Sequence, residues 1–299
     1  MGGTLTKLVV LACVDSAEAA ATVRRALDVP RDAAQALGLS AVHASAEGQY
    51  RDGRGQIIDF KAAVDRAVAS KISLPPGAPL PEPVRARTPE MRVRVVNETT
   101  MTTARRLVDA GHRTLALNFA NGVVPGGGFL HGARAQEETL CRSSALFATL
   151  DGDAMYAAHR SRGDQASSDW AILSPDVPFF RADDGSPLDG PWRLSVLTCA
   201  APEAQRARSD GYDLVAADQL RARIQRVLAI AEAYRFDSLV LGAWGCGAFE
   251  NDPARTARDF RDALAGPFLG VFREVIFAIA DWSPERRFLG PFRDAFAAG

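Results

Sequence analysis

The chain has 299 residues, 47% of them hydrophobic, and a formal net charge of -1. No apolar run approaches the ~18 residues that suggest a membrane span, so the composition predicts a globular protein with no membrane partner. Nearly all of the positive charge is arginine and the pI is near 6.4, whereas a nucleic-acid-binding surface normally brings a basic patch or a higher pI, so we expect no sequence-specific nucleic acid partner.

The cysteines and histidines predict neither a disulfide framework nor a metal site. The cysteines are scattered with no CxxC pair, which favours reduced thiols in a cytoplasm. The histidines show no HExxH or similar spacing, so we expect no structural or catalytic zinc and no cofactor. The apolar run after Lys7 ends at Cys13 and is shorter than the ~7–15 residues of a signal segment, so a first β-strand and a cytoplasmic location are favoured.

Residues 1–88 are expected to form a largely helical N-terminal extension that ends in a proline-rich linker. Segments 17–27 and 60–69 carry apolar residues at helical spacing, and segment 49–55 between them is expected to be a turn. Five prolines fall between residues 75 and 83, which excludes a helix or a central strand there.

From residue 89 to residue 299 the pattern changes to strands that alternate with helices. We expect strands at 92–96, 115–119, 170–173, 194–198, 239–243 and 275–280. We expect one helix that starts after the capping residues 97–100 and runs to residue 110. Further helices are expected at 135–150, 214–234 and 253–264. This alternation predicts an α/β domain with helices on both faces of a sheet.

Two glycine-rich loops, each following a strand, point to a phosphate-bearing ligand. The first continues from strand 115–119 into a helix and contains Asn121, Gly126, Gly127, Gly128, Gln136, Glu137 and Glu138. Glycine lets the backbone approach a ligand closely, and open α/β sheets bind ligands beyond the carboxyl ends of their strands. The second loop, 242–252, leads into a helix that begins with Pro253, and its backbone amides could hold a phosphate.

Each of these features also has a purely structural interpretation. A triple glycine is more often an ordinary loop, and two acids at a helix start complement the helix dipole by about 0.3–1 kcal/mol each. The second loop lacks the GK pair followed by Ser or Thr of a Walker motif. The residues alone therefore predict a phosphate-bearing ligand and leave acid/base chemistry open.

Taken together, the two loops resemble those of the bacterial-type poly(ADP-ribose) glycohydrolases, a branch of the macrodomain superfamily. That family's signature is three glycines, a short spacer and Gln-Glu-Glu, which residues 126–128, seven intervening residues and residues 136–138 match fully. The second loop is similar to the family's diphosphate-binding loop. The resemblance covers roughly residues 90–297, and more loosely 40–74, and implies a macrodomain-like three-layer α/β/α fold with a mixed sheet.

The resemblance also implies an activity: hydrolysis of ribose–ribose O-glycosidic bonds in poly(ADP-ribose), which releases ADP-ribose. The lack of a basic track favours cleavage from chain ends, because binding along a long polyanion would gain from one. Glu138 would be the catalytic acid/base, and Glu137 would hold hydroxyls of the neighbouring ribose. Asn121 and Phe249 would contact the sugar. The remaining implied binding residues are Gly126, Gly127, Gly128 and Gln136, with Gly245, Cys246, Gly247 and Ala248 for the diphosphate.

Two alternatives stay open at this point. The chain could be a non-catalytic ADP-ribose reader, because a fold does not by itself confer activity. It could also remove single ADP-ribose units from ADP-ribosylated proteins or nucleic acids, a reaction that differs only in the leaving group.

Overall fold

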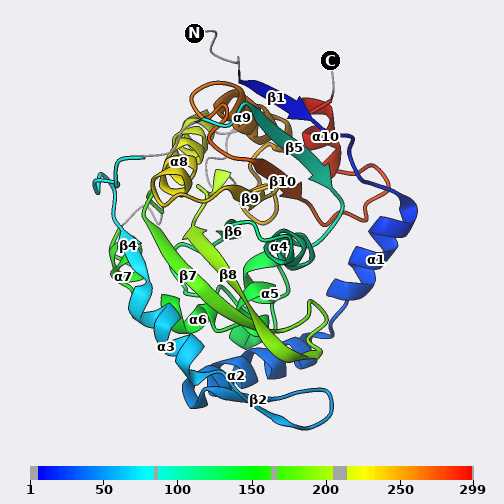
Figure 1. Cartoon of the computed structure of the whole chain (residues 1–299), viewed down its shortest axis with the longest axis vertical. Coiled ribbons are helices and arrows are strands. Elements are labelled where there is room, and N and C mark those ends of the chain that lie inside the picture. The colour runs from blue at the N-terminus through cyan, green and yellow to red at the C-terminus, as the bar shows by residue number, and fades with distance from the viewer. Residues whose placement is uncertain (1–5, 84–86, 163–166, 205–213, 298–299) are drawn as a thin grey trace. The chain divides into compact units, whose positions relative to one another are not determined.

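The computed structural model describes residues 6–83, 87–162, 167–204 and 214–297 (Figure 1). It divides into two compact units, unit 1 with residues 1–23, 77–115 and 201–299 and unit 2 with residues 24–76 and 116–200. Both units contain strands and helices, which confirms the predicted α/β class. Among the helices of the described ranges, none is both long and apolar enough to cross a bilayer.

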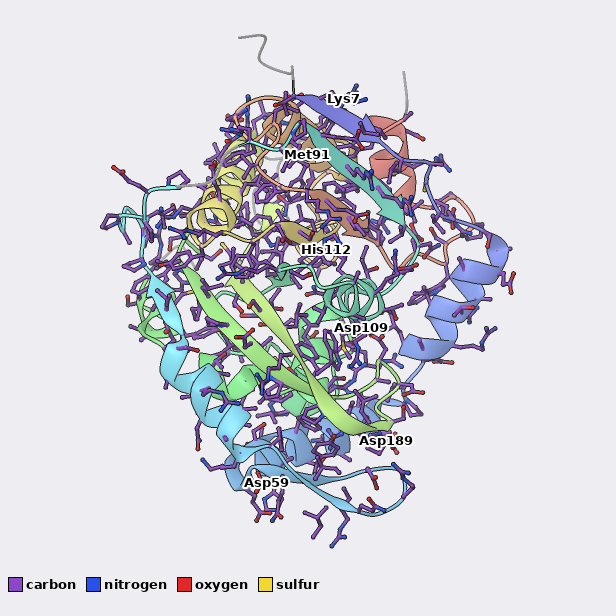
Figure 2. The ribbon with its side chains drawn as sticks, viewed as in Figure 1. Lys7, Asp59, Met91, Asp109, His112 and Asp189 are labelled. Atoms are coloured by element: carbon purple, nitrogen blue, oxygen red, sulfur yellow. The ribbon has the colours of Figure 1, made fainter. Side chains whose placement is uncertain are left out.

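Unit 1 is built on four parallel strands, in the order β1 (Lys7–Val10), β5 (Glu90–Val96), β10 (Glu274–Ala278) and β9 (Ser238–Leu241). Alternate residues of β5 are fully buried, among them Met91, which is labelled in Figure 2. The helices of this unit are α4 (Thr100–Asp109), α8 (Leu214–Ala233), α9 (Pro253–Ala265) and α10 (Leu289–Ala295), and α1 (Ala17–Leu27) begins in it. Thr99 caps α4 by accepting a hydrogen bond from the Thr102 backbone N at 3.0 Å.

Unit 2 combines a long antiparallel strand pair with short helices. Strand β7 (Ala171–Arg181) pairs with β8 (Pro187–Cys199) on one side and with β4 (Ile72–Leu74) on the other. Strand β6 (Thr114–Phe119) enters this unit at residue 116. Its helices are α2 (Arg31–Glu47), α3 (Lys61–Ser70), α5 (Gln136–Ser143), α6 (Leu146–Leu150), α7 (Ala154–Arg160) and the 3-10 helix η1 (Phe129–His131). The expected turn at 49–55 is part of a hairpin between β2 (Gln49–Arg51) and β3 (Ile57–Asp59).

Helix α2 packs on the helix that carries the two adjacent acids. It contacts both α5 and η1. Gly38 permits this approach, because a Cβ at this position would lie 2.6 Å from the carbonyl oxygen of Phe129. Arg181 ties the helices together, since its Nη1 donates to the carbonyl oxygens of Leu37 and Arg142, both at 2.8 Å. Residues 24–76 therefore support α5 within one unit, and the domain boundary placed at residue 88 stays a prediction.

The single helix predicted at 135–150 is wrong, because the chain breaks it into α5 and α6. Between them Ser144 is extended, with φ -148° and ψ 177°, and forms an isolated antiparallel bridge with Phe179. The Ser144 hydroxyl donates to the Leu140 carbonyl at 2.7 Å and accepts from the Leu146 backbone N at 3.1 Å. Helical periodicity could not reveal this break, because the bridging partner belongs to a strand much later in the sequence.

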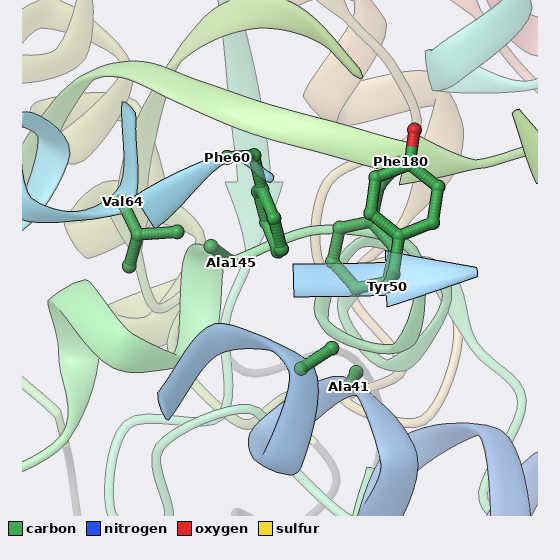
Figure 3. Packing of buried hydrophobic residues seen from close by; sticks show 7 residues of the cluster. Ala41, Tyr50, Phe60, Val64, Ala145 and Phe180 are labelled. Carbon is green, nitrogen blue, oxygen red and sulfur yellow. The ribbon is translucent and has the colours of Figure 1, made fainter. Parts of the chain in front are cut away.

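A buried apolar cluster joins α2, the β2–β3 hairpin, α3 and β7 within unit 2 (Figure 3). The ring of Phe180 lies 5.2 Å from that of Tyr50 and 5.1 Å from that of Phe60, measured between centroids. The polar end of Tyr50 is satisfied, since its hydroxyl donates to the Leu188 carbonyl at 2.9 Å. The other buried members are Ala41, Ala44, Val64 and Ala145.

Replacing Phe180 by alanine should lower the free energy of unfolding by about 3–5 kcal/mol, because the ring is fully buried and its loss leaves a cavity. Urea denaturation of the whole protein measures this. Ile57→Ala is the matched control: Ile57 is 57% exposed, so the same kind of truncation should cost less than about 0.5 kcal/mol. Equal losses in the two variants would contradict the packing of this cluster.

Candidate active site

Two adjacent glutamates at the start of α5 lie buried beneath the loop that follows β6. Only 3% of Glu137 and 8% of Glu138 is exposed. Gln136 fastens this end of α5 to β6, because its Oε1 accepts from the Phe119 backbone N at 2.9 Å and its Nε2 donates to the Leu117 carbonyl at 2.8 Å. The carboxamide of Gln136 is thus used at both ends within the protein, which favours a positioning role over the predicted ligand contact.

Donors from β6 and from the loop that follows it, including the Gly126 backbone N–H, hold the carboxyl group of Glu137. It accepts from the Asn121 backbone N at 2.6 Å and from the Asn118 Nδ2 at 3.3 Å. Burial raises the pKa of Glu137 to about 8. The donors favour the ionised form and the neighbouring charge of Glu138 opposes it, but burial is the largest contribution. Glu137 therefore holds a proton near neutral pH.

Glu138 uses only one of its two carboxyl oxygens within the protein. Its Oε1 accepts from the Gly128 backbone N at 3.0 Å. Its Oε2 is buried and has no hydrogen-bond partner among the described residues. A buried acceptor without a partner costs about 1–3 kcal/mol. The Oε2 atom therefore marks a position that a polar group of a ligand would fill.

Gly127 lies against both carboxyl groups and leaves no room for a side chain. Its φ is +58°, and a Cβ would overlap the Oε1 of Glu138 and lie 3.0 Å from the Oε2 of Glu137. Asn121 shapes the start of the same loop, since its Oδ1 accepts from the backbone N atoms of Val123 and Val124, both at 2.9 Å. With Oδ1 engaged in this turn, the Nδ2 group is what the Asn121 side chain could offer to a sugar.

The second glycine-rich loop lies in unit 1, between β9 and α9. Gly245 has φ +77°, and its carbonyl oxygen accepts from the Nδ2 of Asn251 at 3.0 Å. The Cys246 backbone N donates to the Ala243 carbonyl at 3.1 Å, so this amide is occupied within the loop. Gly247 and Ala248 are exposed, and no hydrogen bond from their N–H groups occurs within the described residues. These free amides beside the start of α9 suit an anion.

Each predicted site residue thus has a place within its own unit. Unit 2 brings together Asn121, the three glycines 126–128, Gln136 and both glutamates, and unit 1 brings together residues 245–249, with Phe249 half-buried. Asn118 was not among the predicted site residues, although it contacts Glu137 and its Nδ2 also lies 3.2 Å from the Thr198 Oγ1. A polar residue near the end of the apolar strand 115–119 was the signal that could have identified it.

Thiol chemistry does not fit this site. All four cysteines are free, and burial raises the pKa of Cys246 to about 12 and that of Cys141 well above its usual value. A thiol is nucleophilic only as the thiolate. Within the described ranges, no cluster of three or more His, Cys, Asp or Glu side chains could hold a metal ion. The groups placed for acid/base chemistry are the two carboxyl groups.

Comparison with known proteins gives a consistent family assignment. Residues 40–182 match the family model described as "Microbial-type PARG, catalytic domain". A poly(ADP-ribose) glycohydrolase structure from Thermomonospora curvata is 38% identical, with a TM-score of 0.79, and the match covers 88% of this chain and 98% of that one. The same organism's enzyme bound to the inhibitor ADP-HPD is 37% identical over 87% and 98% of the two chains, with a TM-score of 0.79.

A third structure extends these matches to a second organism. The Deinococcus radiodurans poly(ADP-ribose) glycohydrolase in complex with ADP-ribose is 43% identical, with a TM-score of 0.66, over 69% of this chain and 84% of that one. A search of curated protein sequences gave no match.

The proton on Glu137 should make stability depend on pH. The pKa of Glu137 is about 8 in the folded protein, against a usual value of 4.5. Between these values the folded state holds a proton that the unfolded state has released, so the free energy of unfolding falls as pH rises. Glu137→Gln removes this titration. From about pH 6 to about pH 8, wild type should lose about 2 kcal/mol relative to that variant.

Urea denaturation of both proteins at several pH values measures this difference. Parallel loss of stability in the two proteins across that window would show that Glu137 is already ionised when folded.

Proposed function

The chain belongs to the poly(ADP-ribose) glycohydrolase family, and on that premise we propose that it hydrolyses the ribose–ribose bonds of poly(ADP-ribose) from chain ends and releases ADP-ribose. The observation that carries the proposal is the buried Oε2 of Glu138, which has no partner among the described residues. The same proposal includes a macrodomain-like three-layer fold, with residues 1–88 as a largely helical extension and residues 89–299 as the catalytic domain. A cytoplasmic location remains part of it, in keeping with four free thiols.

Glu138 is the general acid and then the general base of the proposed reaction. The reaction begins from the protonated form of Glu138, which gives its proton to the departing ribose 2′ oxygen as the glycosidic bond breaks and an oxocarbenium-like sugar develops. The resulting carboxylate takes a proton from the water that attacks the anomeric carbon, which restores the acid. The hydrogen bond from the Gly128 backbone N to Oε1, at 3.0 Å, supports this role because it fixes the direction of Oε2.

Glu137 and the second loop bind the substrate in this scheme. Glu137 holds hydroxyls of the neighbouring ribose, and its proton lets it donate as well as accept. The free amides of Gly247 and Ala248, with that of Gly245, take the diphosphate, whereas the Cys246 amide already serves Ala243. Phosphates near the developing cation would stabilise it. Phe249 packs against the reacting ribose.

The two alternatives differ from this proposal in testable ways. A reader needs only to bind ADP-ribose. Burying two adjacent carboxyl groups costs free energy of folding, and binding alone does not require them. A hydrolase of single ADP-ribose units would share the carboxyl pair. Release of ADP-ribose from polymer, measured beside release from a singly modified protein, separates the three functions.

Glu138→Gln should keep ADP-ribose binding and lose turnover. The amide oxygen can still accept from the Gly128 backbone N, but the side chain can no longer exchange a proton, so polymer turnover should fall by ~10²–10⁴. Calorimetry with ADP-ribose and a release assay on polymer measure the two quantities. Near-normal turnover in this variant would remove Glu138 from the mechanism.

Gly127→Ala should abolish most of the activity by displacing both carboxyl groups, since its Cβ would overlap the Oε1 of Glu138. Displacement by about 1 Å can cost ~10²-fold in rate. Gly190→Ala is the matched control, because a Cβ there meets nothing within 4 Å, and it should keep wild-type turnover in the same release assay. An active Gly127→Ala enzyme would mean that the carboxyl positions are not critical.

A further inference from the structure

The C-terminal end of α7 holds the backbone of the loop above the carboxyl groups. His159 lies with its Nδ1 2.8 Å from the Gly122 carbonyl oxygen, and the Nη1 of Arg160 donates to the Val123 carbonyl at 2.6 Å. Asn121 holds the N–H side of the same stretch through Oδ1. Consecutive peptide groups just after Asn121 are therefore fixed from two directions.

The hydrogen bonds of His159 require one tautomer of the ring. A carbonyl oxygen only accepts, so Nδ1 must carry a hydrogen to bond with Gly122. The Ser168 backbone N–H only donates, and it points at Nε2 at 3.1 Å, so Nε2 must be unprotonated. The Ser168 hydroxyl, 2.7 Å from Nε2, accepts from the Trp170 backbone N and can donate its own hydrogen to Nε2. His159 is 1% exposed, so solvent competes little with these bonds.

The opposite end of α7 is anchored to β4. Asp153 caps the helix by accepting from the Met155 backbone N at 3.0 Å. The same carboxyl group accepts from the Ser73 hydroxyl at 3.0 Å and lies 3.1 Å from the Lys71 Nζ. The Trp170 indole N donates to the Ser73 hydroxyl at 2.8 Å. Helix α7 is therefore fixed at both ends within unit 2.

This arrangement connects His159 to the acidic pair through the backbone. The Asn121 N–H donates to Glu137 at 2.6 Å. Asn121 directly precedes Gly122, whose carbonyl oxygen is hydrogen-bonded to His159. The same loop continues to the Gly128 N–H that holds Glu138. A shift of the Gly122 peptide would move the donors that orient the carboxyl groups.

We propose that His159, as its neutral Nδ1–H tautomer, is a positioning residue of the reaction: it fixes the Gly122 carbonyl and so sets the loop that orients Glu137 and Glu138. The inference rests on the proposed function. His159 touches neither carboxyl group, and its effect passes through the loop backbone. Arg160 contributes to the same hold from the exposed side of α7.

The test compares His159→Leu with His159→Asn in the full-length enzyme. Leucine removes every hydrogen bond of the His159 ring, whereas the asparagine Nδ2 is bonded to Cγ as the imidazole Nδ1 is and can still donate to Gly122. We expect kcat on polymer to fall ~10–100-fold in His159→Leu, with KM and ADP-ribose affinity changing less than about threefold, and asparagine to restore most of kcat. Equal kcat loss in both variants, or no loss in His159→Leu, would overturn the proposal.

His112→Leu is the matched control for the loss of a histidine hydrogen bond. The Nδ1 of His112, labelled in Figure 2, lies 2.6 Å from the Ser238 Oγ in unit 1, whereas the loop after Asn121 belongs to unit 2. This variant should keep wild-type kcat even if its melting temperature falls. A kcat loss equal to that of His159→Leu would show that general destabilisation accounts for both.

Two further measurements do not depend on how His159→Leu folds. Arg160→Met, at an exposed position, should lower kcat in the same direction but less, and unchanged kcat would count against the loop hold. Long-range 1H–15N correlation NMR of the histidine rings in wild type should show His159 as the Nδ1–H tautomer, and an Nε2–H or doubly protonated ring would overturn the assignment. Release of ADP-ribose from polymer by the wild-type enzyme is measured first, so that failure of the proposed function is distinguished from failure of the proposal for His159.

Discussion

Main-chain N–H groups of a single loop hold two buried carboxyl groups, and the rest of unit 2 is arranged around that contact. The Asn121 and Gly128 amides reach Glu137 and Glu138 only because Gly127, between them, has no side chain. Backbone donors cannot rotate away as side chains can, so the carboxyl groups stay in place as long as the loop does. Burial then keeps a proton on Glu137.

Because the positions of the carboxyl groups depend on the loop, the residues and helices that hold the loop also determine the geometry of the site. Gln136 joins α5 to the strand from which the loop departs, and α7 holds the loop from another side. Helix α2 packs on both α5 and η1. These supports contribute no atom to the proposed chemistry. They keep the distances between the reacting groups fixed, which is where much of an enzyme's rate advantage arises.

The sequence predicted what depends on local pattern and missed what depends on distant partners. The acid pair, both glycine loops, α1 and the strands of unit 1 were all visible as spacing or periodicity. Helices α2, α7 and α10 and strand β4 were not predicted, and the break at Ser144 was hidden because its bridge to Phe179 forms only in the folded chain. The position of His159 was likewise invisible, since no local pattern relates it to Gly122.

The close packing of α2 at Gly38 limits how far the protein can be truncated from its N-terminal side. A recombinant fragment that starts after the proline-rich segment would keep the whole glycine and glutamate signature. It would also lack the side chains of α2, α3 and the β2–β3 hairpin that cover Phe180 and Ala145, leaving this apolar surface open to water and prone to self-association. Such a fragment would contain every residue of the signature and would still aggregate.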